Sequence, residues 1–519
     1  MSDSMENQKR ALELYQKIAG YCAEKTFRHY VFQSGCEAPE KPALEWICKE
    51  QDKTCVKSVS YQKLMEDVVS LGTALYLHGW KKKTIAVLES RSYSWVLLAV
   101  TAMCSDICLV PIDCNENQEV LENKLRFCDA SICFSDDPSA VTKSENKALE
   151  VFPFSDVCVL TEEGRRAAEQ GEMCWILDDI SEEQDSVMIF TSGTGGKLKL
   201  GVLSQGSFTL ERKVRQGLGM DQSDSKCLIT LPFFHIAGLI DLRGSLMLGL
   251  TAFISSGLKY LLEEYALAKP EMSFMVPAQA MLLYGVLMGK DKETARNLLG
   301  GKLRLIRTSG APLPQNIREL FHSYGIEVTS DYGMTETSGP VSVSAVKDGR
   351  IVTKPGSVGH ILDCLRVYAE DPDENGCGEI VVEGPCVFKG YYKDPEETAK
   401  IRRNGKIYTG DVGYVDEDRF LFLVGRKKNI IILSNGENII PEELEKRVYR
   451  IPEIKECLVY EEKDKLAVKV YSDCCQDETY LTREIRKLND NQPNHKQIRI
   501  IHIEKNPLPK TGTGKMLRG

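Results

Sequence analysis

Residues 189–201 read IFTSGTGGKLKLG, and they combine hydroxyls, glycines and lysines directly after an apolar run. Glycine lets backbone N–H groups approach an anion closely, hydroxyls add donors, and lysine adds positive charge. The same composition is typical of an ordinary surface loop, because Gly and Ser tolerate unusual backbone angles. Two interpretations are therefore open, a phosphate cradle and a simple loop. A Walker loop is disfavoured, because Leu198 follows Lys197 where that motif needs Ser or Thr.

Two later segments carry groups that a bound nucleotide would need. The stretch SDYGMTETSG, residues 330–339, holds an aromatic ring in Tyr332, a hydroxyl in Thr335 and a carboxylate in Glu336. Tyr332 would stack on a base, Thr335 would bind phosphate, and Glu336 would hold Mg²⁺, which prefers oxygen ligands together with substrate phosphates. The stretch RTSGAPLP, residues 307–314, offers small residues and a proline-stiffened turn that suit a flat ligand. Taken alone, SDYGMTETSG is more often a polar turn.

Three further segments each contribute a single residue of interest. LPFFHIAG places His235 after two aromatic residues, where a histidine is more often a packed core residue. Residues 408–445 place Asp411 on a tight turn near their start, where its carboxylate would accept both hydroxyls of a ribose or would bond its own backbone. Residues 506–519 place Lys515 in a Gly/Thr-rich stretch, where a lysine is usually only solvated.

Alternating helix-like and strand-like runs separate these segments. TIAVLES, CLIT and SFMVP predict buried strands, SVMIF predicts a strand that ends at the Gly-rich stretch, and YQKLMEDVVSLGTALYLHGW has the apolar spacing of a helix. This alternation predicts an α/β architecture, in which ligands bind at strand ends. From residue 350 the pattern is more β-like, and residues 427–519 predict a small α+β domain. We therefore predict two domains, residues 1–426 and 427–519, divided near the basic stretch GRKKN.

A length of 519 residues predicts more than one domain. The composition, 42% hydrophobic and 27% charged, is that of a folded globular protein. A net charge of −9 disfavours nucleic acid or an anionic membrane as a partner. The eighteen cysteines lack metal-binding spacing, so we expect buried reduced thiols, with Cys104, Cys108 and Cys114 as the tightest group.

The N-terminal residues predict an amphipathic surface helix without a secretory core. Residues 93–112 form the longest apolar stretch and predict a buried helix that runs into a strand rather than an integral membrane segment. With no targeting signal and many thiols, a cytoplasmic location is expected.

In this order and at these spacings, the segments resemble the acyl-adenylating superfamily, which contains acyl-CoA synthetases, carrier-linked adenylation domains and firefly luciferase. The resemblance implies a large N-terminal domain of β-sheets layered with helices, a small mobile α+β C-terminal domain, and an active site between them. It also implies that ATP and Mg²⁺ convert a small-molecule carboxylic acid into an acyl-AMP with release of pyrophosphate. A thiol then displaces AMP, and that thiol belongs to CoA or to the phosphopantetheine of an acyl carrier protein.

The resemblance assigns roles to individual residues of this chain. It implies that Glu336 holds Mg²⁺ together with Thr194, that Thr335 contacts the α-phosphate, that His235 joins the catalytic group, and that Lys515 acts on the bridging oxygen and the substrate carboxylate. Lys428 matches the hinge, about which the C-terminal domain would rotate to present Gly436 to the thiol. The implied nucleotide-binding residues are Thr191, Ser192, Gly193, Thr194, Gly196, Lys197, Lys199, Gly310, Ala311, Pro312, Asp331, Tyr332, Gly333, Met334, Asp411, Arg426 and Gly436.

The chain also departs from the pattern of that superfamily. The usual TGKPKG reads GGKLKL in residues 195–200, so we expect a looser loop and weaker pyrophosphate binding. Lys515 stands four residues before the end of the sequence, so we expect it to be weakly tethered. A free amino acid is a less suitable substrate, because Asp241 does not fit the position that would bind an ammonium group.

Three hypotheses remain for the function. The first hypothesis is an acyl-CoA synthetase, because the sequence is most similar to synthetases that activate fatty or other simple carboxylic acids. The second hypothesis is an acyl-AMP ligase that loads a separate carrier protein. The third is a degenerate nucleotide-binding protein, which the retained Glu336, Asp411, Arg426 and Lys515 disfavour.

Overall fold

The computed structural model divides the chain into two compact units. Unit 1 comprises residues 1–366 and 383–407, and unit 2 comprises residues 367–382 and 408–519. The predicted boundary between residues 426 and 427, at which a mobile C-terminal domain would begin, stays a prediction. The structure describes Glu13, Gln16 and residues 26–50, 53–141, 149–172, 180–191, 197–209, 212, 225–311, 313–347, 350–434, 437–475, 477–490, 492–509, 516 and 518.

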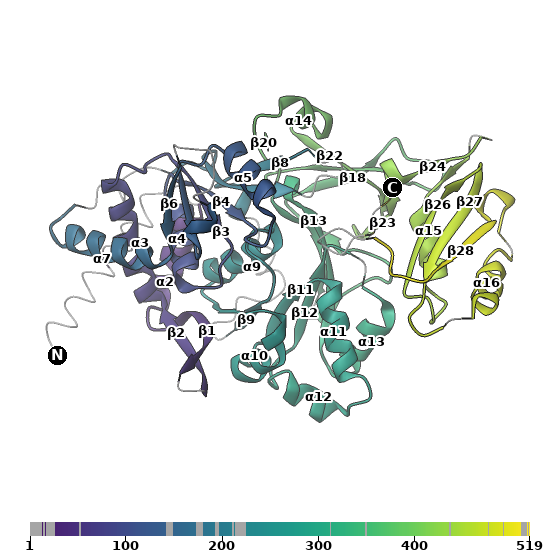
Figure 1. Ribbon diagram of the computed structural model, residues 1–519, viewed down its shortest axis with the longest axis horizontal. Coiled ribbons are helices and arrows are strands. Elements are labelled where there is room, and N and C mark those ends of the chain that lie inside the picture. The colour runs from purple at the N-terminus through teal and green to yellow at the C-terminus, as the bar shows by residue number, and fades with distance from the viewer. Residues whose placement is uncertain are drawn as a thin grey trace. The chain divides into compact units, whose positions relative to one another are not determined.

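One sheet of unit 1 has seven strands in the order β20-β8-β7-β4-β3-β5-β6 (Figure 1). Its central strands are parallel, whereas β8 runs antiparallel to β7, and β20 runs antiparallel to β8. The strands are β3 (Thr84–Leu88), β4 (Cys108–Ile112), β5 (Ile132–Ser135), β6 (Glu150–Pro153), β7 (Asp185–Thr191), β8 (Lys199–Ser204) and β20 (Gly390–Tyr391).

The second sheet of unit 1 has nine strands in the order β17-β14-β13-β12-β11-β9-β10-β1-β2. The strands from β13 to β1 are parallel, and antiparallel partners close both edges. They are β1 (Pro42–Glu50), β2 (Lys53–Ser60), β9 (Lys226–Ile229), β10 (Thr251–Ile254), β11 (Met272–Met275), β12 (Leu305–Ser309), β13 (Glu327–Met334), β14 (Gly339–Val343) and β17 (His360–Ile361). A separate pair consists of β15 (Ala345–Lys347) and β16 (Arg350–Val352).

Helices of unit 1 are layered on these sheets, and side-chain caps define where several of them begin. Ser60, Ser92 and Asn117 each accept a hydrogen bond from a backbone N–H of the first turn, which supplies a partner that the helix itself lacks. The helices are α2 (Phe27–Glu37), α3 (Tyr61–Leu77), α4 (Tyr93–Met103), α5 (Gln118–Phe127), α6 (Pro138–Val141), α7 (Ser155–Glu169), α9 (Ile236–Met247), α10 (Leu261–Ala268), α11 (Pro277–Leu287), α12 (Lys292–Leu298), α13 (Gln315–Ser323) and α14 (Pro395–Ile401).

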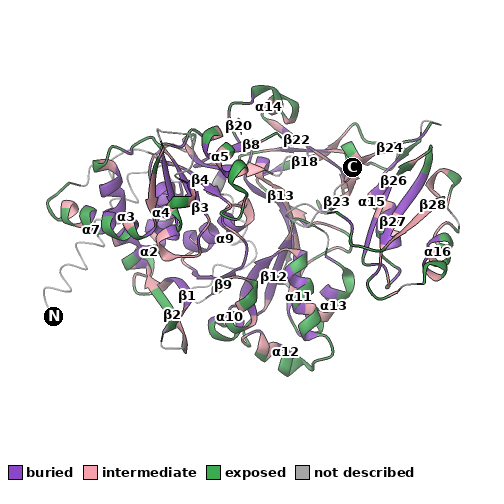
Figure 2. Ribbon diagram, in the orientation of Figure 1, coloured by how far each residue is buried: buried purple, intermediate pink, exposed green. Residues whose placement is uncertain are grey.

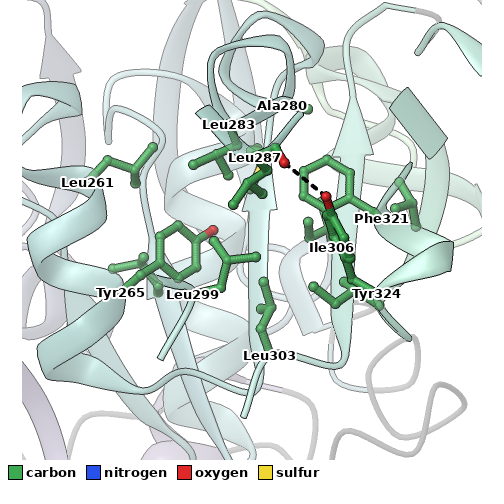
Figure 3. Close-up of a cluster of buried hydrophobic side chains, with 14 of the residues drawn as sticks. Leu261, Tyr265, Ala280, Leu283, Leu287, Leu299, Leu303, Ile306, Phe321 and Tyr324 are labelled. Atoms are coloured by element: carbon green, nitrogen blue, oxygen red, sulfur yellow. Dashed lines mark hydrogen bonds between the residues drawn. The ribbon is translucent and has the colours of Figure 1, made fainter. Parts of the chain in front are cut away.

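The core beside the second sheet packs α10–α13 against β11–β13. Figure 3 shows Leu283, Leu287 and Ile306 in one buried cluster with the rings of Tyr265 and Phe321. The hydroxyl of Tyr324 donates a hydrogen bond of 2.9 Å to the carbonyl of Leu287, so this buried phenol keeps a polar partner. Burial follows the inner strands of both units in Figure 2. The core therefore fixes the parallel strands whose carboxyl ends carry the predicted ligand groups.

The described part of unit 2 contains two larger sheets, a short strand pair and a hydrophobic core of its own. The first sheet contains β18 (Arg366–Glu370), β19 (Gly378–Glu383), β22 (Lys406–Val415) and β23 (Leu421–Arg426). The second contains β26 (Glu456–Glu462), β27 (Lys465–Tyr471) and β28 (Ile500–Glu504), and it packs against α15 (Pro441–Val448) and α16 (Glu478–Lys487) through residues such as Val448, Val468 and Ile485. A short pair consists of β24 (Ile431–Ile432) and β25 (Asn438–Ile439).

The predicted α/β fold class is confirmed, and so are individual elements. The helix-like run from Tyr61 is α3, the apolar stretch after Tyr93 is α4 followed by β4, and SVMIF lies in β7. The predicted N-terminal helix falls almost entirely outside the described residues. Among the described residues, no helix combines the length and the apolar character that crossing a membrane requires.

Candidate functional site

The lysine-bearing stretch lies in an antiparallel hairpin. Thr191 at the end of β7 pairs with Lys199 at the start of β8. The Gly-rich segment therefore connects two strands rather than a strand and a helix, which is a second reason against a Walker loop. Four of its predicted phosphate residues lie outside the described part of the chain: Ser192, Gly193, Thr194 and Gly196.

Both lysines of this hairpin contact carboxylates at the start of α14. Lys197 Nζ lies 2.6 Å from Asp394 Oδ2, and Lys199 Nζ lies 2.7 Å from Glu397 Oε2. The Lys197 side chain is 65% exposed whereas that of Lys199 is 25% exposed, so Lys199 is held more firmly. Hydrogen bonds from Lys199 and Lys400 lower the pKa of Glu397 to about 2. The carboxylate that faces Lys199 is therefore ionised at neutral pH.

Tyr391 joins this hairpin to the predicted magnesium ligand. Its ring centroid lies 5.2 Å from Lys199 Nζ, and its hydroxyl donates a hydrogen bond of 2.5 Å to Glu336 Oε1. Burial and the Glu336 charge together raise the pKa of Tyr391, so the phenol keeps its proton. Gly201 of β8 pairs with Tyr391, and a Cβ at Gly201 would lie 3.2 Å from Thr335 Cγ2. The structure thus brings Lys199, Thr335 and Glu336 to one place.

Glu336 fits a magnesium site that a nucleotide completes. It follows β13 in the short 3-10 turn Thr335–Thr337 and is buried. The Tyr391 hydroxyl donates its hydrogen bond to Oε1 of Glu336, and no described residue donates a hydrogen bond to Oε2. Within the described residues, no three acidic, histidine or cysteine side chains gather as a metal cluster. A single carboxylate beside phosphate oxygens is the arrangement that Mg²⁺ adopts in nucleotide enzymes.

The predicted adenine segments lie at the ends of neighbouring parallel strands. Ser309 pairs with Asp331 in the β12–β13 ladder, which places Gly310 and Ala311 beside Tyr332. Gly310 has a φ of +89°, a left-handed backbone angle that glycine adopts without a steric penalty, and Ala311 is exposed. Pro312 lies outside the described residues.

Asp331 is not an open carboxylate, because it forms a buried ion pair with Arg307. Arg307 Nη2 lies 2.6 Å from Asp331 Oδ2, and Nε donates to the same oxygen at 2.7 Å. Both side chains are 2% exposed. The pair joins β12 to β13, so Asp331 fixes the strand that carries Tyr332. Gly333 and Met334 then complete β13, and a Cβ at Gly333 would lie 2.2 Å from the Gly339 carbonyl oxygen.

His235 immediately precedes α9, on a loop that Glu89 and Trp95 support. The backbone N–H of Phe233 donates to the Glu89 carboxylate at 3.1 Å, and the Phe233 ring stacks on Trp95 with centroids 4.6 Å apart. Arg91 Nε lies 3.2 Å from Glu89 Oε1. Burial raises the pKa of Glu89 to about 7 despite the opposing effect of Arg91. The carboxyl group of Glu89, with its pKa of about 7, therefore supports this loop through the backbone of Phe233.

The predicted ribose residues form a pair within unit 2. Asp411 in β22 lies opposite Arg426 in β23, and Arg426 Nε lies 2.8 Å from Asp411 Oδ1. Lys428 lies in the short 3-10 turn Lys427–Asn429. Gly436 and Lys515 lie outside the described residues. Arg518 Nη2 lies 2.6 Å from Glu445 Oε2 within unit 2, and the weak tethering expected for Lys515 stays a prediction.

Sequence reasoning did not identify several residues that hold the site together. Tyr391, Asp394 and Glu397 belong to the stretch GYYKDPEET, residues 390–398, whose aromatic and acidic residues were a signal near a predicted cationic loop. Arg307 and Glu89 gave no such signal, because their partners lie 24 and 144 residues away in the sequence.

Comparisons with known proteins show the family of this chain. Residues 32–392 match the model of the family described as AMP-binding enzyme. A 2-succinylbenzoate–CoA ligase from Oceanobacillus iheyensis is 26% identical over 95% of this chain and 98% of its own length. A 2-succinylbenzoate–CoA ligase from Lactococcus lactis is 32% identical over 66% of this chain and 71% of its own length.

A solved structure with the same fold is the o-succinylbenzoate CoA synthetase from Bacillus subtilis. In complex with its acyl-adenylate intermediate it superposes with a TM-score of 0.75 at 22% identity, covering 94% of this chain and 96% of that one. Its complex with ATP and magnesium gives the same TM-score at 23% identity, covering 94% and 98%. The likeness confirms the predicted fold of adenylate-forming enzymes. The family match covers more than half of the sequence, and the chain belongs to the AMP-binding enzyme family.

Proposed function

We propose that this chain is an ATP-dependent carboxylic acid–CoA ligase that works through an acyl-adenylate. The observation that carries the proposal is the convergence of Lys199, Thr335 and Glu336 around one hairpin, with Tyr391 joining the lysine to the carboxylate. Membership of the AMP-binding family and the names of the relatives support the same reaction class.

The reaction proceeds in two displacements. A carboxylate oxygen of the acid attacks the α-phosphorus of ATP, and pyrophosphate leaves with the electrons of the broken P–O bond. The thiol of CoA then loses its proton and attacks the acyl carbon, and AMP leaves. Two anions must approach each other in the first step, so prearranged cations and N–H donors supply most of the rate enhancement.

Individual residues of this chain would each take one of these tasks. Lys197, Lys199 and Thr335 bind phosphates. Gly310, Ala311 and Pro312 wall the adenine, with Asp331 and Tyr332 beside it. His235 serves the acid, Asp411 with Arg426 holds the ribose, and Lys515 acts in the first displacement. Magnesium held by Glu336, together with Thr194, would neutralise charge on the phosphates.

The acid and the acceptor are the open parts of the proposal. Because two relatives are named for 2-succinylbenzoate, that acid belongs in the test beside simple aliphatic and aromatic acids. CoA is the proposed acceptor, and an acyl carrier protein is the alternative. A cytoplasmic location, where CoA and ATP are both available, remains part of the proposal.

The test measures pyrophosphate release from Mg-ATP across this panel of acids, with and without CoA. We expect release that depends on one class of acid, formation of a thioester once CoA is added, and loss of release in Glu336→Gln and Lys515→Ala. A thioester formed only on a carrier protein would replace CoA as acceptor. ATP binding without release for any acid would overturn the proposal in favour of a nucleotide-binding protein without catalysis.

A further inference from the structure

Two cysteines face each other across the hairpin of β1 and β2. Cys48 pairs directly with Cys55 in the antiparallel register, and their sulfur atoms lie 2.8 Å apart. The Cys55 thiol also points at the Cys48 carbonyl oxygen, 3.6 Å away. Directly opposed residues of antiparallel strands have Cα atoms about 4.5–5.5 Å apart, which lies within the range that disulfides span. The backbone spacing therefore suits a disulfide, and the two sulfur atoms need to approach each other by less than about 1 Å to reach the bonded length.

No other pair of described cysteines has this arrangement. Cys104 is buried, whereas Cys114 and Cys158 are exposed, so the expectation of buried thiols does not hold for every cysteine. Cys48 and Cys55 are both half-buried, so a small oxidant reaches them while larger reagents are hindered. Once either thiol of this pair is oxidised, the thiol nearest to it is its partner across the hairpin.

We propose that Cys48 and Cys55 are a redox modification site that forms a reversible intramolecular disulfide. With hydrogen peroxide as oxidant, one thiolate attacks a peroxide oxygen and becomes a sulfenic acid, and the other oxygen leaves as water after taking up a proton. The second thiolate then attacks the sulfenic sulfur, the S–S bond forms, and a second water leaves. Two thiols are oxidised by two electrons in total and one peroxide is reduced. A low-molecular-weight thiol reverses the reaction by exchange.

The position of the pair decides what the bond would do. β1 pairs with β10 only from Leu44 to Trp46, so Cys48 lies beyond the last strand that supports the hairpin from the sheet. The end of the hairpin is a two-stranded ribbon, and such ribbons are marginally stable without a third strand (Figure 1). A covalent link between Cys48 and Cys55 would hold this ribbon closed, whereas the reduced form opens locally.

The experiment equilibrates the full chain with hydrogen peroxide or with glutathione disulfide, blocks free thiols with a maleimide under acid conditions, and maps tryptic peptides without reduction. Trypsin cuts after Lys49 and Lys53, between the two cysteines. We expect residues 54–57 to be joined to residues 29–49, the product being two hydrogens lighter than the sum of its peptides. Reduction should release both peptides. Recovery of Cys48 and Cys55 as maleimide adducts, while Cys114 and Cys158 are oxidised, would overturn the proposal.

Matched variants identify the linked sulfur. Peptide 29–49 also contains Cys36, whose thiol has a pKa raised to about 11 by burial. Cys36→Ser should keep the cross-link, whereas Cys48→Ser and Cys55→Ser should each abolish it. Amide exchange gives a second readout, and oxidation should slow exchange in residues 47–56 by roughly tenfold in the wild type. A cross-link that persists in Cys48→Ser, or exchange that is unchanged by oxidation, would contradict the assignment.

Discussion

The hydroxyl of Tyr391 donates a hydrogen bond to the carboxylate of Glu336, although the two residues lie 55 positions apart in the sequence. Tyr391 stands in β20, which pairs with β8 next to Lys199. One phenol therefore contacts the proposed phosphate-binding cation and the proposed magnesium ligand together. A hydrogen bond of this kind orients a ligating carboxylate and tunes its affinity for the metal.

Replacing Tyr391 by phenylalanine tests this link. Tyr391→Phe keeps the ring beside Lys199 but leaves Glu336 free to rotate, so we expect the magnesium concentration for half-maximal pyrophosphate release to rise by about 10-fold or more. Glu336→Gln should abolish measurable turnover at any magnesium concentration. An unchanged magnesium dependence in Tyr391→Phe would separate the tyrosine from the metal site.

The two hairpin lysines should differ in their effect on ATP. Lys199 is held between Glu397 and the Tyr391 ring, whereas Lys197 is largely exposed. A held cation loses less conformational entropy when it binds a phosphate. Lys199→Met should therefore raise the KM for ATP by about 10-fold or more, and Lys197→Met by clearly less. Steady-state kinetics with ATP varied at a saturating acid concentration would measure both, and a larger effect at Lys197 would contradict this order.

The buried pair of Arg307 and Asp331 should govern the stability of unit 1. Asp331→Asn leaves a guanidinium buried without its counter-charge, and we expect the free energy of unfolding to fall by about 3–5 kcal/mol. The double variant Arg307→Met/Asp331→Leu should regain most of that loss, because no charge then remains buried. Chemical unfolding followed by intrinsic fluorescence gives both values. A double variant no more stable than the single one would show that shape, not charge, dominates.

Glu89 should make stability depend on pH. Its folded pKa, about 7, is above the unfolded value, so the folded state retains the proton when the unfolded state has lost it. The contribution of Glu89 is therefore full below about pH 4 and is lost as the pH rises to about 7. Compared with the wild type, Glu89→Gln should gain about 2–3 kcal/mol of stability between pH 5 and pH 8. Urea unfolding at several pH values measures this difference, and a constant difference would contradict the raised pKa.

Two glycines of unit 1 should respond in opposite ways to alanine. In Gly333→Ala the new Cβ would meet the backbone of Gly339 at 2.2 Å, so we expect a loss of stability of about 3 kcal/mol or more together with loss of activity. In α11, Gly285 has open space around it, and Gly285→Ala should raise stability by about 0.5–1 kcal/mol through its better helix propensity. Thermal unfolding of both variants tests the contrast, which fails if both changes have the same sign.

Local elements could be predicted from the sequence because their signals are local. The apolar spacing after Tyr61 predicts α3, and short apolar runs predict β3, β9 and β11, because burial on one or both faces imposes these patterns. The order of motifs was sufficient to recognise the superfamily. The convergence of Lys199, Thr335 and Glu336 agrees with that recognition, and the roles of individual residues stay predictions.

The partners of the site residues could not be predicted in the same way. The contact of Lys199 with Glu397 joins residues 198 positions apart, and it depends on the register of β8 with β20. The nucleotide-binding role expected for Asp331 likewise gave no indication of Arg307, because a buried arginine in a strand has no distinctive sequence pattern. Such contacts arise from strand order and packing, which no local window contains.

The pairing of Thr191 with Lys199 has a consequence for how this sequence can change over evolutionary time. Residues between them can be exchanged or added without moving Lys199, because the ladder beyond the loop fixes its place. This tolerance accommodates Gly195 and Leu198, where the superfamily usually has threonine and proline. Deleting one residue inside β8 would instead turn Leu200 toward Tyr391 and the lysine to the opposite face of the sheet. Substitutions and insertions are therefore tolerated in the loop, whereas a deletion in the following strand β8 would displace the lysine.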